Sequence, residues 1–483
     1  MQDAVTGVGA SGPLALAAFV GYLLMVLAIG VYATRFSSQG VGEFFVGGRR
    51  MNRFVVALSA VVSGRSAWLL LGVTGVAYTR GASAIWTVTG YTAVEFILFL
   101  TLAPRLRAFA EEHDCVTLPD VFAARFNDRD GWLRLTLAVV LLLFMVGYVS
   151  AQFTAGGKAI GASFGVTPGI GVLITAGIVL GYTMTGGFLA VSLTDTLQAV
   201  FMLVGLVLLP VVAFRDGGGF AAVMGELRGF DPALVDPLAL GVGAFLGMVG
   251  IGLGSPGNPQ IVVRFMSIAD QAQLRFAAWV ATFWNVVMGV GAVAIGLAGR
   301  VLIPDVSVLP GADPESLYPV LAQEHLPPVL FGVVVASIFA AIMSTADSQL
   351  LVGASTVARD VYEKVLNRDR AVDPRRLVWI SRLVVAALVV AALLLGVVAE
   401  DVVFWLVLFA WGGLGAAIGP PLLFSLYWRG TTRSGVVAGM AVGTLVTVVW
   451  ELVPVLKGAL YGLIPAFFLS ALAVVVVSAA GRR

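Results

Sequence analysis

Long apolar runs recur along the whole sequence, and residues 135–149 and 377–398 are examples that contain at most one charge. They lack the period-two alternation of a membrane β-strand. Because a bilayer forces each spanning segment to bond its own backbone polar groups, such runs predict helices. The residues are 59% hydrophobic and only 12% charged, with a mean hydropathy of +0.99. We therefore expect an all-α integral membrane protein, and the net charge of +2 gives no sign of nucleic-acid binding.

Windows of about 20 apolar residues predict thirteen transmembrane helices. They lie near 13–33, 54–78, 82–103, 133–157, 167–185, 188–214, 236–257, 274–302, 327–356, 376–398, 402–427, 433–454 and 459–480. Residues 1–13 carry no basic region, so the first window is expected to belong to the mature protein rather than to a signal peptide.

The positions of Lys and Arg predict the orientation. Of the 29 Lys and Arg residues, 22 lie on one side of the membrane, at alternate ends of the predicted helices, and six lie on the other side. The remaining one, Arg65, lies within a predicted helix. Under the positive-inside rule the richer side is cytoplasmic, which puts the N-terminus outside and the C-terminus inside. The expected surroundings are the lipid bilayer of a cell membrane, with no obligatory protein partner.

The connecting loops are too short for a separate soluble domain, so residues 1–483 are expected to form one transmembrane domain. Residues 117–126 predict a short helix on the cytoplasmic surface. The outer stretch 305–325 is expected to be a solvated connector rather than a lid. A single cysteine, Cys115, excludes disulfides and zinc clusters, and few histidines leave little for catalysis, so an enzyme is not expected.

The stretch 55–72 is long enough to cross a bilayer, yet Ser63, Gly64 and Ser66 interrupt its middle. Among them lies Arg65, too deep to reach the interface easily. An arginine at this depth costs about 2.5 to 3.5 kcal/mol on insertion scales, so it needs a carboxylate, free carbonyls or a water-filled cavity. We interpret the stretch as a discontinuous helix that carries a binding site; a kinked packing helix with a structural ion pair is the alternative.

Four ionisable side chains lie deep within predicted helices: Arg65, Glu95, Asp195 and Asp347. Three hydroxyls adjoin the last of them: Ser344, Thr345 and Ser348. Three carboxylates facing one guanidinium leave a deficit of positive charge, which a bound cation or a proton would fill. Hydroxyl, carboxylate and carbonyl oxygens suit a hard ion such as Na⁺.

Two further stretches predict helix breaks, 250–259 with its glycines and prolines and 411–421 with WGGLGAAIGPP. The breaks at 55–72 and 250–259 are five predicted helices apart. They indicate two five-helix repeats of opposite topology, at 54–214 and 236–427, as in inverted-repeat transporters. Residues 13–33 then form an extra N-terminal helix, and 433–480 form two extra C-terminal helices.

The sequence resembles the sodium:solute symporter family, and within it the bacterial sodium/proline symporters. The motifs that carry the resemblance are FFVGGRRM (44–51), LSAVVSGRSAWLLLG (58–72), TLPDVFAARF (117–126), GGFLAVSLTDTLQA (186–199), RFMS (264–267), FAAIMSTADSQLLV (339–352) and FAWGGLGAAIGP (409–420). It implies a LeuT-like core of ten helices and Na⁺-driven uptake by alternating access.

The resemblance also implies site residues. The sodium site of the family corresponds here to Val62, Arg65, Ala341, Ser344 and Thr345. A second ion position, present in some members, corresponds to Asp195, Ser344, Asp347 and Ser348. The expected solute contacts are Ser66, Tyr148, Gln152, Ser255 and Trp411.

This chain departs from the proline symporters near the expected site. They carry an aspartate and a methionine where it has Gly64 and Arg65, and aromatic residues where it has Ile251 and Ser255. Three roles for Arg65 follow: a charge pair with Glu95 or Asp347, a bidentate clamp for a solute carboxylate, or a fixed charge that replaces Na⁺.

We expect a Na⁺-coupled symporter for a small organic solute, either an amino acid such as proline or another small carboxylate. A Na⁺-independent or proton-coupled transporter of the same fold is one alternative. A solute-sensing module that works with a separate kinase is another.

Overall fold

The computed structural model describes residues 12–37, 47–184, 187–370, 372–398 and 403–481. Residues 1–11, the start of the first family motif (44–46) and the last two arginines of the charge count lie outside this part. The first half contains α1 (Gly12–Ser37), α3 (Arg53–Gly64), η3 (Trp68–Val73), α4 (Thr74–Arg80), α5 (Ile85–Leu100), α6 (Leu102–Glu112), α7 (Leu118–Phe126), α8 (Trp132–Phe164), α9 (Pro168–Thr183), α10 (Phe188–Asp216) and α11 (Phe220–Phe230). The second half contains α12 (Val242–Gly250), η6 (Ile251–Gly257), α13 (Pro259–Ser267), α14 (Leu274–Leu302), α15 (Leu317–His325), α16 (Pro328–Ser355), η11 (Thr356–Leu366), α17 (Pro374–Val398), α18 (Val403–Tyr427), α19 (Arg433–Leu452), α20 (Pro454–Ala459) and α21 (Leu463–Ala480).

Within the described residues, ten helices are long and apolar enough to cross a membrane. Three further apolar segments are shorter: 53–64, 168–183 and 242–257. Two of these three are the first halves of helices that the sequence predicts to be broken. The multi-pass, all-helical character is thus established, whereas thirteen crossings remain a prediction.

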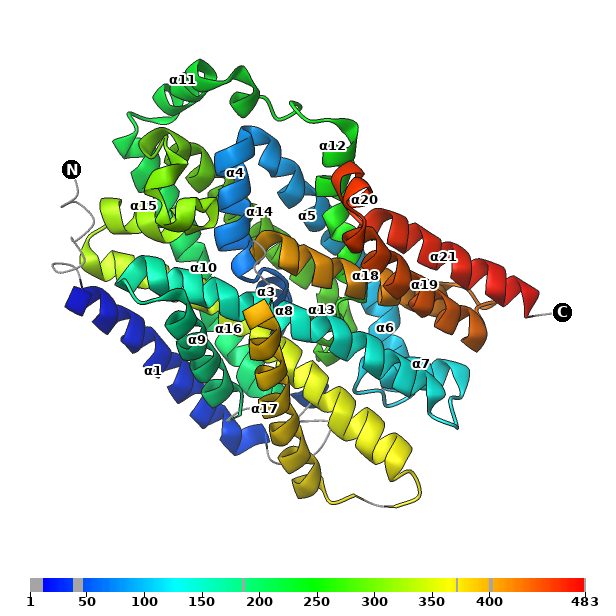
Figure 1. Cartoon of the computed structure of the whole chain (residues 1–483). Helices are drawn as coiled ribbons and strands as arrows, with labels where there is room; N and C mark the ends of the chain where they lie inside the picture. The colour runs from blue at the N-terminus through cyan, green and yellow to red at the C-terminus, as the bar shows by residue number, and fades with distance from the viewer. Residues whose placement is uncertain (1–11, 38–46, 185–186, 371, 399–402, 482–483) are drawn as a thin grey trace.

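The short helix α3 lies at the centre of the molecule (Figure 1). It packs against α10, α13, α14 and α16, while α1 covers the outer side of α10 and α16. Helices α19 and α21 pack together and against α18. The central position of α3 explains why its residues from Val56 to Gly64 are all buried although the helix has only 12 residues.

The break predicted at 411–421 is wrong, because α18 runs without interruption from Val403 to Tyr427. Its glycines are packing positions instead of hinges. A Cβ on Gly415 would lie 2.5 Å from the Cα of Gly254, and one on Gly257 would lie 2.3 Å from the Leu414 carbonyl oxygen. Glycine is therefore needed here so that the backbones of α18 and η6 can touch.

The predicted short helix at 117–126 is present as α7, which begins with a reciprocal capping box between Thr117 and Asp120. Asp120 also accepts from Arg134 at 2.7 Å and from Arg359 at 3.2 Å. Burial raises the pKa of this carboxyl, but the two guanidinium groups outweigh burial and lower it. These ion pairs tie α7 to the ends of α8 and η11.

The stretch 305–325 is not a solvated connector throughout, as the sequence predicted. Glu315 is buried, and it accepts from Lys158 of α8 at 2.6 Å and from the amide of Phe404 at 2.7 Å. The amide of Val403 donates to the same carboxylate at 3.0 Å. Burial raises the pKa of Glu315, against the opposing effect of Lys158. Its carboxylate therefore joins α8 to the N-terminus of α18.

Replacing Glu315 with Ala should destabilise the fold by about 2 to 4 kcal/mol, because a buried ion pair and two hydrogen bonds from backbone N–H groups are lost together. E315Q should cost less, since its amide oxygen still accepts from the α18 backbone. Thermal unfolding in detergent measures both variants. Equal melting temperatures for E315A and the unmodified protein would contradict this role.

Candidate functional site

The central helix breaks where the sequence predicts. Helix α3 ends at Gly64, and Arg65 has non-helical backbone angles (φ −110°, ψ 36°) before the π-helical segment η3 begins at Trp68. The backbone N–H of Ala67 donates to the side-chain oxygen of Gln152 at 3.2 Å. The backbone N–H of Trp68 donates to the Ser66 hydroxyl at 3.2 Å. These backbone donors at the break thus find side-chain acceptors, as apolar surroundings require.

The carbonyls released by the break face α16. The Ser344 hydroxyl lies 3.2 Å from the carbonyl oxygens of both Val62 and Ala341. The Thr345 hydroxyl lies 3.4 Å from the Val62 oxygen and 3.2 Å from the Ser63 oxygen. All of these residues are fully buried. Five oxygens from two helices therefore converge at one point.

The oxygen–oxygen distances of 3.2 to 3.4 Å fit a cation of the size of Na⁺ or Ca²⁺. An ion that takes its oxygens at about 2.4 Å, as Ca²⁺ does, separates neighbouring ligands by about 3.4 Å in an octahedral shell. Na⁺ is nearly as large as Ca²⁺. The hydroxyls of Ser344 and Thr345 donate to carbonyls here, and rotation about their C–O bonds would turn their lone pairs toward an ion. Of the predicted ligands, Arg65 meets this group through its backbone N–H, which donates to the Val62 carbonyl oxygen at 3.1 Å and cannot itself coordinate a cation.

Arg65 forms an ion pair with Glu95 of α5, and both side chains are buried. Its Nε donates to Asn285 at 2.9 Å, and its guanidinium carbon lies 3.6 Å from the centre of the Tyr91 ring. Asn285 in turn donates to Glu95 at 2.9 Å. Of the two partners that the sequence left open, the structure pairs Arg65 with Glu95. Asp347 makes no ion pair with Arg65.

Asp195 pairs instead with Arg264 of α13, at 2.9 Å. The same guanidinium donates to Ser59 and Ser348, each at 2.6 Å. Ser348 also lies 3.2 Å from an oxygen of Asp347, so three of the four residues predicted for a second ion form one cluster. The fourth, Ser344, bonds the Val62 and Ala341 carbonyl oxygens instead. One oxygen of each aspartate, Asp195 Oδ1 and Asp347 Oδ2, is buried with no hydrogen-bond partner in the described part of the chain.

Arg264 was not predicted as a site residue. The charge count places it on the cytoplasmic side, whereas the structure buries its side chain between α3, α10 and α16. The signal was its apolar neighbours in IVVRFM, which are unusual for a loop arginine. Asn285 and Tyr91 were not predicted either, because the prediction started from the charged groups within the helices and the hydroxyls beside Asp347.

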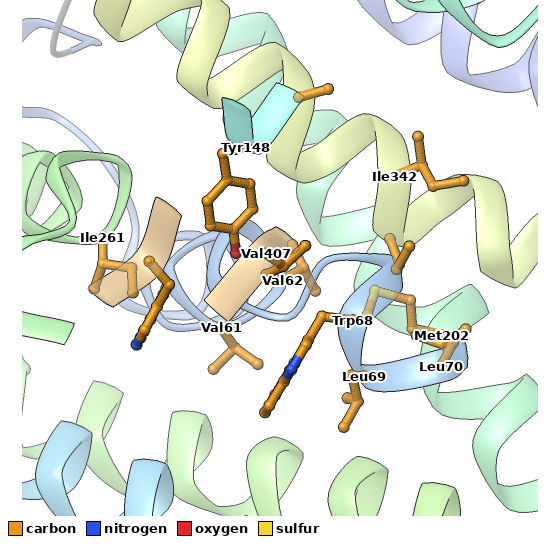
Figure 2. Close-up of a cluster of buried hydrophobic side chains, with 14 of the residues drawn as sticks. Val61, Val62, Trp68, Leu69, Leu70, Tyr148, Met202, Ile261, Ile342 and Val407 are labelled. Atoms are coloured by element: carbon orange, nitrogen blue, oxygen red, sulfur yellow. The ribbon is translucent and has the colours of Figure 1, made fainter. Parts of the chain in front are cut away.

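The predicted solute contacts fall into two groups. Tyr148, Gln152 and Ser66 lie together at the break, and Figure 2 shows the Tyr148 ring extending toward Val62. By contrast, the Ser255 hydroxyl donates to Glu95 at 3.2 Å. The Trp411 indole donates to the carbonyl oxygen of Ile251 at 2.8 Å, and so braces η6.

Two buried donors near the break have no partner among the described residues, Nε2 of Gln152 and Nε1 of Trp68. Unpaired buried donors are rare in native structures and call for an explanation. Figure 2 shows Trp68 among apolar side chains such as Val61, Leu69 and Val407. A bound polar group would satisfy these donors.

The sequence matches the model of the sodium:solute symporter family over residues 44–443. It is 36% identical over 473 residues to a protein named "Sodium/proline symporter" from Staphylococcus aureus (strain JH9), covering 95% of this chain and 91% of the relative. Sequences from other strains, such as COL, give the same values.

Solved structures share the fold at low sequence identity. The outward-open, substrate-bound form of a Na⁺-coupled sialic acid symporter superposes with a TM-score of 0.81 at 19% identity, covering 97% of this chain and 98% of that one. MhsT in complex with L-phenylalanine gives a TM-score of 0.59 at 12% identity, covering 89% of this chain and 98% of that one. The helices are thus arranged as in LeuT-like transporters.

Proposed function

Since the chain belongs to the sodium:solute symporter family, whose members are transporters and not enzymes and use Na⁺ as the coupling ion, we propose that it imports a small organic solute across the bacterial inner membrane. The solute is an amino acid such as proline or another small carboxylate. The proposed topology has thirteen membrane helices, an outer N-terminus and an inner C-terminus. Its core consists of two inverted five-helix repeats, at 54–214 and 236–427.

The observation that carries the proposal is the convergence of α3 carbonyls and α16 hydroxyls at the break. Na⁺ held by Val62, Ala341, Ser344 and Thr345 joins the two helices. It therefore stabilises the arrangement in which they are close. Release of Na⁺ into the cytoplasm removes this link and lets the helices separate, which couples the ion gradient to alternating access.

The buried charges support a second cation. Arg65 and Glu95 neutralise each other, whereas Asp195 and Asp347 share only Arg264. The second cluster is left with one negative charge in apolar surroundings if both carboxyls are ionised. A second Na⁺ beside Asp347 and Ser348 neutralises it. A proton on one carboxyl does the same, which makes proton coupling the second candidate mechanism.

The solute is held by neutral donors in this proposal. Because Arg65 is already engaged by Glu95 and Asn285, it is a poor clamp for a further carboxylate. The unpaired donor of Gln152 lies beside the break, near Ser66 and Tyr148. It fits a carboxylate or hydroxyl oxygen of the solute.

Uptake of labelled proline and other amino acids into proteoliposomes tests the function. Accumulation should require a Na⁺ gradient, and K⁺ should not replace it. A melting-temperature screen in NaCl and in KCl selects the solutes, since a ligand of the folded state raises the melting point. Uptake driven equally by a proton gradient would favour the proton-coupled alternative. Binding without uptake would favour the sensory alternative.

Replacing Gln152 with Leu should raise the KM for solute at least tenfold, because the Ala67 amide and the solute both lose a partner. The Na⁺ dependence should change much less, since the residues proposed for Na⁺ are intact. Initial uptake rates at varied solute and Na⁺ concentrations measure both. S150A is the control, because Ser150 lies on the same helix, is equally buried and is not proposed to contact solute.

A further inference from the structure

A hollow lies away from the break, lined by residues of α4, α12, α18 and α20. Figure 1 labels these four helices. It is half open to solvent, and its empty space of about 650 Å³ includes part of that solvent. Its walls are largely apolar and aromatic, with contributions from Met248, Phe404, Trp405 and Tyr461. This is the make-up of small-molecule pockets, which combine apolar walls with a few polar groups.

Two basic residues, Arg80 and Lys457, line the hollow. Lys457 forms an ion pair with Glu451. Arg80 is exposed, and in the described part of the chain no carboxylate lies within ion-pair distance of it. The hollow therefore has one positive charge that the protein does not neutralise.

An aromatic partition separates this hollow from the break. Phe404 lines the hollow, and its ring stacks on Trp68 of η3 with centroids 5.7 Å apart and planes 20° from parallel. The backbone N–H of Phe404 also donates to the Glu315 carboxylate, and this hydrogen bond fixes the start of α18. The hollow is thus a distinct site on the proposed extracellular side of this partition.

We propose that this hollow binds an organic carboxylate with an apolar body. Arg80 pairs with the carboxylate through its planar fork of N–H groups, and Lys457 adds positive charge beside it. The apolar body lies against the rings of Phe404, Trp405 and Tyr461. Neither Na⁺ nor the break takes part, so the site is independent of the proposed coupling mechanism.

Fluorine NMR of the full chain in phosphatidylcholine nanodiscs tests the site with 4-fluorobenzoate as the probe and 4-fluorobenzamide as its uncharged analogue. The benzoate should bind saturably, and the benzamide at least tenfold more weakly. R80Q should weaken benzoate binding at least fivefold. R228Q is the matched control, because Arg228 of α11 is also exposed and does not line the hollow. It should leave binding unchanged.

Equal binding of the two probes, or equal effects of R80Q and R228Q, would overturn the proposal. So would loss of benzoate binding when phosphatidylglycerol replaces phosphatidylcholine, because the hollow would then hold a lipid phosphate. If a transported amino acid competes with benzoate, the carboxylate that binds the hollow is the solute itself. If it does not compete, the carboxylate is a separate modulator. Both results support the site, and NaCl and KCl should give the same affinity.

Discussion

Replacing Glu95 with Gln should destabilise the folded protein by about 3 to 5 kcal/mol, because it leaves the Arg65 guanidinium buried without a counter-charge. Arginine cannot shed its proton, so this charge persists at any usable pH. R65M should cost less, since the isolated Glu95 carboxyl can take up a proton. The double variant R65M/E95Q restores neutrality and should recover much of the stability lost in E95Q.

Thermal unfolding of all four proteins in one detergent completes a double-mutant cycle. The two substitutions should be strongly non-additive. The control is D369N, which removes the ion-pair partner of Arg368. Both side chains are largely exposed, so this surface pair should contribute little to stability. Additive effects of R65M and E95Q would show that the pair is not a unit.

The second large effect is expected for the double variant S344A/T345A. Both hydroxyls face the carbonyls freed by the break, and removing them takes two of the proposed oxygen ligands from Na⁺. The Na⁺ concentration for half-maximal uptake should rise at least tenfold, which corresponds to about 1.4 kcal/mol of binding energy. The KM for solute at saturating Na⁺ should change less.

The control for this variant is S337A. Ser337 lies on the same helix and is equally buried, but its hydroxyl bonds Val334 and Tyr318, away from the break. Its loss should leave the Na⁺ dependence unchanged. If S344A/T345A and S337A showed the same half-maximal Na⁺ concentration, the proposed role of the two hydroxyls would be wrong.

Some elements of this structure can be predicted from the sequence and others cannot. The break at Arg65 was predictable, because flexible residues and a deep charge are unfavourable in a regular membrane helix. The pairing of Arg65 with Glu95 rather than with Asp347 could not be predicted. Residues at equal depth can pair only if their helices are neighbours and face each other, and a count along the chain gives depth alone.

The glycine-rich stretch of α18 illustrates another limit. Glycine in a membrane helix permits either a hinge or close backbone contact, and the sequence does not distinguish the two. At Gly415 the contact with η6 decides it. Arg264 illustrates a third limit, since it becomes a core residue only because α13 brings it against Asp195, which lies 69 positions earlier in the chain.

Equilibrium binding of radioactive sodium to the purified protein tests the central claim most directly, because it needs no knowledge of the solute. Scintillation proximity measures it on the unmodified chain, S344A/T345A and S337A. We expect saturable binding that unlabelled Na⁺ displaces and K⁺ does not, weakened at least tenfold in S344A/T345A and unchanged in S337A. Absence of saturable binding, or equal affinity in all three proteins, would contradict a sodium site at the break of the central helix.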